Sequence, residues 1–184
     1  MIPILSTDRL NLRPFTRADL SEFTALHGDP RSMRDHGLTL TPRQSAEKLT
    51  AYLESAAMHG IGRFHVSDAA GFIGYVGVNA DGGVDHPLGR HHEIGWRLLP
   101  QAWGKGYATE AAHVALKDAF TRLRLSEVLA YTAPDNGPSQ AVMTRLGLTR
   151  RPEMDFTIAD PIVGEWSGLV WSVRPGDQRA GAFQ

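Results

Sequence analysis

A short glycine-rich turn joins an expected strand to an expected helix in the middle of the chain, and this unit limits what the rest can fold into. Glu93–Leu99 alternates polar and apolar residues, which predicts a strand, and residues 108 to about 123 have the apolar spacing of an amphipathic helix. Between them, Gly104 and Gly106 allow the backbone to approach a bulky anion, because neither carries a side chain. The first turn of a helix also has unpaired N–H groups and the positive end of the helix dipole. The sequence therefore predicts a phosphate-binding site at this turn.

Two common nucleotide-binding motifs do not fit the turn. A Walker A loop would need glycine at position 99 and serine or threonine at position 106, where the chain has Leu99 and Gly106. A Rossmann fingerprint would need a glycine in place of Thr109. The phosphate ligand is therefore expected to belong to another class of cofactor.

The turn resembles the Gln/Arg-x-x-Gly-x-Gly/Ala motif of the GNAT superfamily of acyl-coenzyme A-dependent N-acyltransferases, with Gln101, Gly104 and Gly106 in its three fixed places. The resemblance implies that the turn binds the pyrophosphate of acetyl-CoA, and that the backbone of Leu98 and Leu99 pairs with the pantetheine arm. The expected cofactor contacts within the turn are Gln101, Trp103, Gly104, Lys105, Gly106, Tyr107, Ala108 and Thr109.

The beginning of the chain carries a second resemblance. Thr7–Pro14 reads Thr-x-Arg-Leu-x-Leu-Arg-Pro and precedes an expected short helix, which is similar to the GNAT branch that contains the ribosomal-protein-alanine N-acetyltransferases. Homodimers are common among such relatives, so a homodimer is one expectation for the assembly. The acceptor amine itself is left open between a protein N-terminus and a small molecule.

Length and composition are those of an ordinary globular protein. The 184 residues suit a single domain, expected over residues 1–174 with a loose tail over 175–184. The net charge of −1 and the lack of a basic block give no sign of nucleic-acid binding. No apolar run reaches the roughly 20 residues of a membrane helix, and no secretory signal is recognised at the start. A cytoplasmic protein without a membrane partner is expected.

The order of expected elements predicts a mixed α/β fold. A strand, two helices, a β-meander, the helix after the turn, a strand, a helix and two more strands follow one another, with a loop expected over Asn79–His92. This is the order of the GNAT fold, whose mostly antiparallel sheet we expect to have about six to seven strands and about four flanking helices. The helix after the turn is expected to direct Glu110, His113, Lys117 and Arg122 away from the core.

Asn136 and Ser139 form a second cluster of interest. Asn136 is well placed to cap the short helix that follows it. The GNAT resemblance adds two roles: Asn136 contacts the pantetheine arm, and Ser139 lies near the thioester sulfur. Since no tyrosine lies in this helix, Ser139 is the candidate acid, acting mainly through a hydrogen bond to developing negative charge.

Glu93, near the start of the strand before the turn, is the second catalytic candidate. A glutamate at such a position is either solvated or paired with a cation such as Arg90 or Arg97. The GNAT resemblance instead implies that it accepts the proton of the amine. At pH 7 an α-amine costs roughly 1 kcal/mol to deprotonate and a lysine side chain roughly 4.6 kcal/mol. A mild base therefore suits an α-amine or another weakly basic amine.

The remaining candidate ligand residues have weaker support from the sequence. Lys105 is expected to pair with a phosphate, and Arg145 either reaches the 3′-phosphate of the cofactor or is simply solvated. The histidines at 86, 91 and 92 lack an accompanying carboxylate cluster, so no metal site is predicted.

These observations together favour an N-acetyltransferase. It would move an acetyl group from acetyl-CoA to a primary amine by direct attack in a ternary complex, since the chain has no cysteine to carry the acyl group. The alternatives are a CoA-binding sensor or assembly module without turnover, and a phosphate-binding protein unrelated to CoA.

Overall fold

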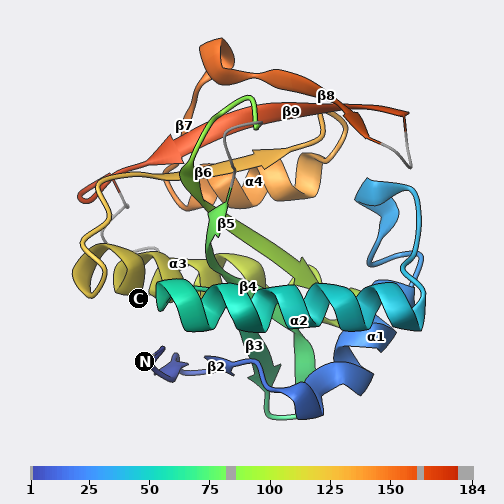
Figure 1. Ribbon diagram of the computed structural model, residues 1–184. Helices are drawn as coiled ribbons and strands as arrows, with labels where there is room; N and C mark the ends of the chain where they lie inside the picture. The colour runs from blue at the N-terminus through green and yellow to red at the C-terminus, as the bar shows by residue number, and fades with distance from the viewer. Residues whose placement is uncertain (1, 82–85, 161–163, 178–184) are drawn as a thin grey trace.

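The computed structural model describes residues 2–81, 86–160 and 164–177 (Figure 1). Its four helices are α1 Leu20–Gly28, α2 Pro42–His59, α3 Tyr107–Thr121 and α4 Gly137–Arg145. Its strands are β1 Leu5–Ser6, β2 Asn11–Pro14, β3 Arg63–Asp68, β4 Gly71–Asp81, β5 His91–Leu98, β6 Val128–Thr132, β7 Thr149–Arg150, β8 Phe156–Asp160 and β9 Gly164–Val173. Within the described ranges, no helix combines the length and apolarity needed to cross a bilayer.

The strands form one sheet in the order β1-β2-β3-β4-β5-β6-β9-β7, and β8 pairs with β9 outside this path. Neighbouring strands are antiparallel except β5 and β6, which run parallel and share a single register pair, Glu93 with Leu129. The mixed α/β fold and the mostly antiparallel sheet are confirmed. The sheet has nine strands, more than expected, because β1 and β7 have only two residues each and leave no readable pattern in the sequence.

Helices cover both faces of the sheet. Figure 1 shows α2 crossing in front of the strands, and α1 and α2 pack with Tyr75 of β4 around a cluster of aromatic and leucine side chains. The larger cluster joins the sheet to α3 and α4, and includes Val76, Ile94 and Leu116. Alanines at 111, 112, 115 and 119 of α3 are all buried, so their small side chains let this helix lie close to β4 and β5.

The helix boundaries follow from local sequence. The Thr41 hydroxyl accepts from the Gln44 N–H, and the Gln44 side-chain oxygen accepts from the Thr41 N–H, so the expected capping box begins α2. Gly60 ends this helix in a left-handed conformation, as expected. Helix α3 begins at Tyr107, immediately after the glycine-rich turn.

Two local expectations were wrong. Glu110 does not face away from the core: it is 6% exposed, and its carboxylate accepts from the Thr7 hydroxyl and the Arg9 guanidinium. The N-terminal strands cover the first turn of α3, which a helical pattern read in isolation does not reveal. The expected loop over 79–92 is also shorter, because Asn79–Asp81 continues β4 and His91 already begins β5; residues 82–85 lie outside the described residues.

Candidate active site

The glycine-rich turn has the backbone geometry that its sequence predicts. Gly104 and Gly106 have φ values of 73° and 79°, a region that residues with a side chain enter only at a cost. The first helical bond runs from the Glu110 N–H to the Gly106 carbonyl at 3.0 Å. Within the described part of the chain, the N–H groups of residues 104–109 have no backbone acceptor. The turn therefore presents a row of donors at the positive end of α3.

A cavity of about 640 Å³ lies beside this turn. Its walls come from the turn, the end of β5, the loop after α1 and one side of α4 as far as Arg145. Among the residues that the structure describes, five cationic side chains and one carboxylate, that of Asp35, line it; the cations are Arg31, Arg34, Arg97, Lys105 and Arg145. Because the whole chain has a net charge of −1, this positive charge is local. Such a cavity suits a ligand with several negative charges.

The end of β5 has one open edge beside this cavity. The Leu99 N–H donates to the Ile73 carbonyl at 2.8 Å, and the Leu99 carbonyl accepts from Ala102, so both backbone groups of Leu99 are used. Leu98 faces the other way, and its carbonyl accepts from the Trp103 indole N–H at 2.8 Å. By alternation, Trp96 has its backbone groups on the same edge as Leu98. This edge faces the space that opens where β5 and β6 diverge after Glu93.

The start of α4 closes this space from the other side. The Asn136 side chain caps the helix by accepting from the Ser139 N–H at 3.3 Å, and it donates to the Thr132 hydroxyl at 2.9 Å. The expected cap is therefore present. Across the gap, the Trp96 indole N–H donates to the Ser139 hydroxyl oxygen at 3.3 Å. The Ser139 oxygen thus accepts a bond from the protein, and its own proton is available to another acceptor.

A second cavity of about 840 Å³ lies on the far side of Ser139. Helix α2, strands β4, β5 and β6, and the β8–β9 hairpin contribute to its lining. Five residues line both cavities: Asp35, Trp96, Arg97, Asn136 and Ser139. The two spaces therefore meet at the pair formed by Trp96 and Ser139.

Glu93 lines the second cavity and forms an ion pair with Arg63. The Arg63 Nη2 lies 2.5 Å from the Glu93 carboxylate, and both side chains are largely buried. Arg63 reaches it across two strands, because Gly77 of β4 and Gly95 of β5 lie beside it in register. A Cβ added at Gly95 would come within 2.7 Å of the guanidinium. The cation that pairs with Glu93 is therefore Arg63, and the sequence suggested Arg90 or Arg97.

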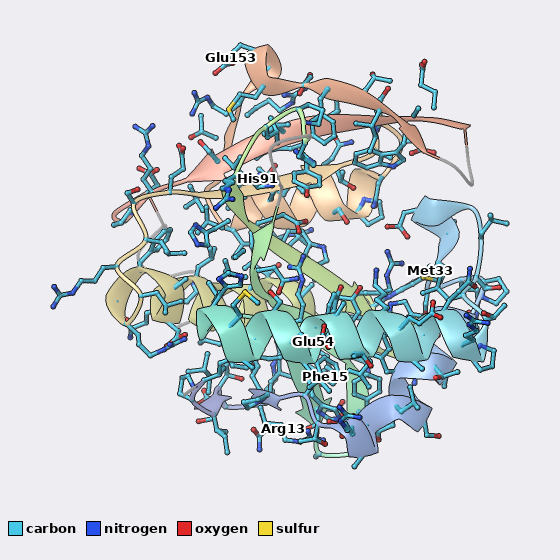
Figure 2. The ribbon with its side chains drawn as sticks, in the orientation of Figure 1. Arg13, Phe15, Met33, Glu54, His91 and Glu153 are labelled. Carbon is cyan, nitrogen blue, oxygen red and sulfur yellow. The ribbon has the colours of Figure 1, made fainter. Side chains whose placement is uncertain are left out.

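Arg97 fixes the loop between α1 and α2 at the boundary of the two cavities. Its guanidinium donates to the Ser32 carbonyl and makes two bonds to the Asp35 carboxylate, at 2.8 and 2.9 Å. Burial would lower the pKa of Arg97, but Tyr75 and Asp35 outweigh it and raise that pKa. The loop, in which Met33 is buried (Figure 2), is thus held against β5 by a permanently charged side chain.

Comparisons with known proteins agree with this geometry. The Acetyltransferase (GNAT) domain family matches residues 9–149. The chain belongs to the GNAT acetyltransferase family. It is 28% identical over 162 residues to an uncharacterized N-acetyltransferase, YoaA, of Bacillus subtilis, covering 82% of this chain and 85% of that protein.

Solved structures extend the likeness to nearly the whole GNAT chain. An acetyltransferase from Agrobacterium tumefaciens has a TM-score of 0.79 and 30% identity, covering 95% of each chain. The ribosomal L7/L12 alpha-N-protein acetyltransferase RimL, in complex with coenzyme A, has a TM-score of 0.74 over 94% of this chain and 98% of that one. At 11% identity, the second comparison supports the fold alone.

Most residues that the sequence pointed to in this GNAT acetyltransferase come together around the two cavities. Leu98, Asn136 and Ser139 line the cavity beside the turn, as do residues 103–109. Glu93 lies in the second cavity. Gln101 is exposed in the short 3-10 turn Pro100–Ala102 and lies outside both linings.

Three residues at the centre of the site were missed as site residues: Arg63, Trp96 and Arg97. The glycines at 74, 77 and 95 carried a signal, because glycines within strands indicate that something bulky passes close to the backbone. They did not say which side chain passes there, because the alignment of Arg63 with Gly77 and Gly95 depends on the register of three strands. The bond from Trp96 to Ser139 joins residues 43 positions apart, and no local pattern predicts it.

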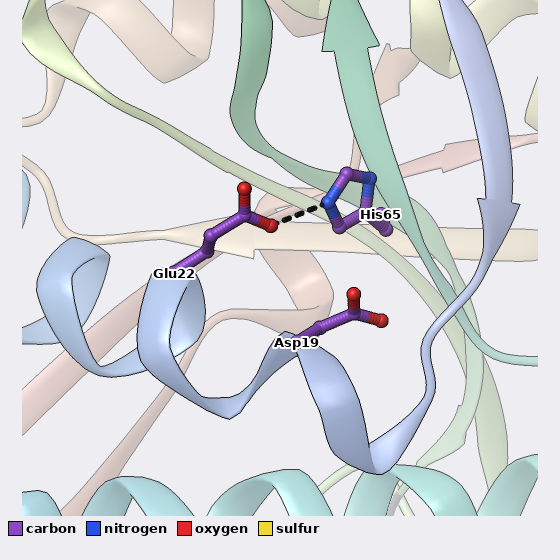
Figure 3. A group of neighbouring side chains, drawn as sticks. All are labelled: Asp19, Glu22 and His65. Carbon is purple, nitrogen blue, oxygen red and sulfur yellow. Dashed lines mark hydrogen bonds and ion pairs between the residues drawn. The ribbon is translucent and has the colours of Figure 1, made fainter.

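The histidines and a carboxylate cluster have structural contacts. The His86 and His91 rings are in tilted contact, with centroids 4.9 Å apart, and His91, at the start of β5 (Figure 2), donates from Nδ1 to the Gly89 carbonyl. Asp19, Glu22 and His65 have ligand atoms within 4.8 Å of one another (Figure 3). His65 bonds to Glu22 at 2.8 Å, and two bonds from Arg13 occupy Asp19. These contacts tie the start of α1 to β2 and β3.

Proposed function

We propose that the protein transfers an acetyl group from acetyl-CoA to a primary amine by direct attack within a ternary complex. The observation that carries the proposal is the meeting of a basic, N–H-rich cavity with a second cavity at Ser139. One space suits the diphosphate and pantetheine of the donor, and the other suits the acceptor. A single domain over residues 1–174 and a cytoplasmic location stay predictions.

The turn would hold the pyrophosphate of acetyl-CoA through its backbone N–H groups, with the charge of Lys105 in addition, and Arg145 would reach the 3′-phosphate. Pantetheine amides would pair with the open edge of β5 at Trp96 and at the N–H of Leu98, since the Leu98 carbonyl accepts from Trp103 and both backbone groups of Leu99 are already bonded. Asn136 uses one amide hydrogen on Thr132 and would offer the other to the pantetheine arm.

Ser139 would assist departure of the thiolate. When the amine nitrogen attacks, its new bond to the acetyl carbon forms and the carbon–sulfur bond breaks, which leaves negative charge on sulfur. The Ser139 hydroxyl would donate to that sulfur while its oxygen accepts from Trp96. With its oxygen oriented by the indole N–H, the hydroxyl needs little rearrangement during the reaction.

Glu93 would accept the proton that the attacking amine releases, directly or through a water. Its pairing with Arg63 makes it a mild acceptor, because the guanidinium stabilises the carboxylate form. Such a base is sufficient for an α-amine, which costs roughly 1 kcal/mol to deprotonate at pH 7. Positioning of the two substrates would then provide most of the acceleration.

Thiol release from acetyl-CoA tests the proposal. Purified protein is assayed with a panel of amines, and coenzyme A binding is measured separately by calorimetry. We expect coenzyme A to bind, thiol release to require an amine, and Glu93→Gln to slow turnover with little change in coenzyme A affinity. Binding without thiol release for any amine would instead indicate a CoA-binding module. Protection by ATP and not by coenzyme A in a thermal shift would contradict the proposal entirely.

A further inference from the structure

The wall of the second cavity that β6, β8 and β9 form is aromatic. Tyr131, Phe156 and Trp166 lie edge to face or tilted, with ring centroids 5.3 to 6.2 Å apart, and His86 packs against Tyr131 and Phe156. All four line the cavity. Gly168 is needed beneath this wall, because a Cβ there would lie 2.7 Å from the Phe156 ring. The wall offers flat apolar surface to whatever enters.

The opposite wall is positively charged. Lys48 of α2 lines the cavity and, among the described residues, has no carboxylate within ion-pair distance. Arg63 and Arg97 also line it, and each contacts a carboxylate. The described lining therefore holds three cations and the two carboxylates of Asp35 and Glu93, and Lys48 is the cation in excess.

The hydroxyl of Tyr75 marks where this positive charge converges. Burial would raise the pKa of Tyr75, but Arg97, Lys48 and Arg63 outweigh it and lower that pKa. The same potential that favours a negative charge on the Tyr75 oxygen favours a bound anion beside it. Tyr52 and Tyr75 also line the cavity; their hydroxyl groups bond to each other, which leaves one proton of the pair to donate to such an anion.

We infer that the acceptor is a small zwitterionic amine that carries an aromatic group, as an aromatic amino acid or a short peptide beginning with one does. Its ring would lie on the wall of Tyr131, Phe156 and Trp166, its carboxylate would lie near Lys48, and its amine would point to the junction at Ser139. This deepens the proposed function and rests on it. Polyamines and aminoglycosides are disfavoured, because both described carboxylates of the cavity already contact arginines.

Steady-state thiol release with acetyl-CoA at saturation tests the inference. The acceptors are L-phenylalanine, Phe-Gly and Phe-Gly-Gly, which place the carboxylate at increasing distances from the amine. Phenylalaninamide, L-alanine and spermidine lack the carboxylate, the ring or both. We expect the best acceptor among the first three to exceed each of the last three in kcat/KM by at least about tenfold, the value of one charged hydrogen bond for the carboxylate and of burying an aromatic ring for L-alanine.

Variants test whether Lys48 recognises the carboxylate and whether the aromatic wall recognises the ring. Lys48→Met should raise the KM of the best zwitterionic acceptor by about tenfold. The rate of this variant with phenylalaninamide should equal that of the parent, because phenylalaninamide has no carboxylate for Lys48 to contact. Lys117→Met, the same change at an exposed position on α3, should alter neither. Trp166→Leu should lower the ratio of kcat/KM for the best aromatic acceptor to kcat/KM for L-alanine. The coenzyme A affinity of this variant should match that of the parent.

Two results would overturn the inference and leave the proposed function intact. One is faster acetylation of spermidine than of any zwitterionic acceptor. The other is an unchanged KM for the zwitterionic acceptor in Lys48→Met. Failure of coenzyme A to bind the parent protein would instead contradict the proposed function itself.

Discussion

Removing the Ser139 hydroxyl tests the proposed chemistry most directly. Its hydrogen bond to the departing thiolate would be charge-assisted, and such bonds contribute about 1.5 to 3 kcal/mol. At about 1.36 kcal/mol per factor of ten, Ser139→Ala should lower kcat by roughly tenfold to 160-fold. The KM for acetyl-CoA should change little, because the hydroxyl bonds to charge that develops only during the reaction.

Trp96 makes this prediction sharper, because it is proposed to act through Ser139. Its indole N–H lies 3.3 Å from the Ser139 oxygen. Trp96→Phe removes that donor and keeps an aromatic ring, so kcat should fall by about twofold to tenfold, the value of one neutral hydrogen bond. In a Ser139→Ala background the same substitution should have almost no effect, since the partner is already gone.

The assay is single-turnover thiol release with acetyl-CoA bound, measured for the parent, both single variants and the double variant. Coenzyme A affinity by calorimetry serves as the control for intact binding. Fully additive effects of the two substitutions would refute the proposed coupling. A Ser139→Ala rate equal to that of the parent would remove Ser139 from the mechanism.

Three further predictions concern stability and the cofactor. Burial would raise the pKa of Asp19, but hydrogen bonds from Arg13 and Thr16 lower it to about 2; the resulting stability is present above about pH 4 and is lost as pH falls through 2. Acid titration of urea unfolding should show a loss of about 2 kcal/mol that Asp19→Asn abolishes, and an unchanged profile in that variant would contradict this. Gly106→Ala should lower the free energy of unfolding by about 1 to 2 kcal/mol and weaken coenzyme A binding, because the φ of Gly106 is 79°. Gly28→Ala, at a position with open space and an ordinary φ, should change neither quantity; thermal shifts with and without coenzyme A compare the two variants. Arg145→Met should raise the Kd of coenzyme A about threefold to tenfold and leave that of 3′-dephospho-coenzyme A unchanged; equal effects on both would place Arg145 elsewhere.

The sequence was most informative where structure depends on neighbours along the chain. The strand before the turn, the glycines at 104 and 106, the start of α3, the Thr41 capping box and the Asn136 cap were all predicted. Each depends on residues within about one helical turn, where backbone preference and local hydrogen bonds decide the conformation. The order of the remaining elements was likewise read from local patterns, and it matched the order of the GNAT fold.

Contacts between distant segments were the part that could not be predicted. Glu110 was assigned to solvent because the helix pattern contains no information about the strands that cover its first turn. Arg63 reaches Glu93 only because β3, β4 and β5 lie in one register, with Gly77 and Gly95 between them. Register depends on the whole sheet, and a single sequence does not specify it.

Because β5 and β6 share only one register pair, main-chain groups on this side of β5 beyond Glu93 have, among the described residues, no neighbouring strand in the middle of the sheet. In a continuous sheet these main-chain groups would be bonded to a neighbouring strand, and here a small molecule would take that place. Donor binding and folding would then be linked, with a stabilisation that grows as RT ln(1 + [L]/Kd). Hydrogen exchange of the Trp96 and Leu98 amides should accordingly be fast in the free protein and slow once acetyl-CoA is bound. The donor substrate would then supply the hydrogen bonds that a neighbouring strand makes elsewhere in the sheet.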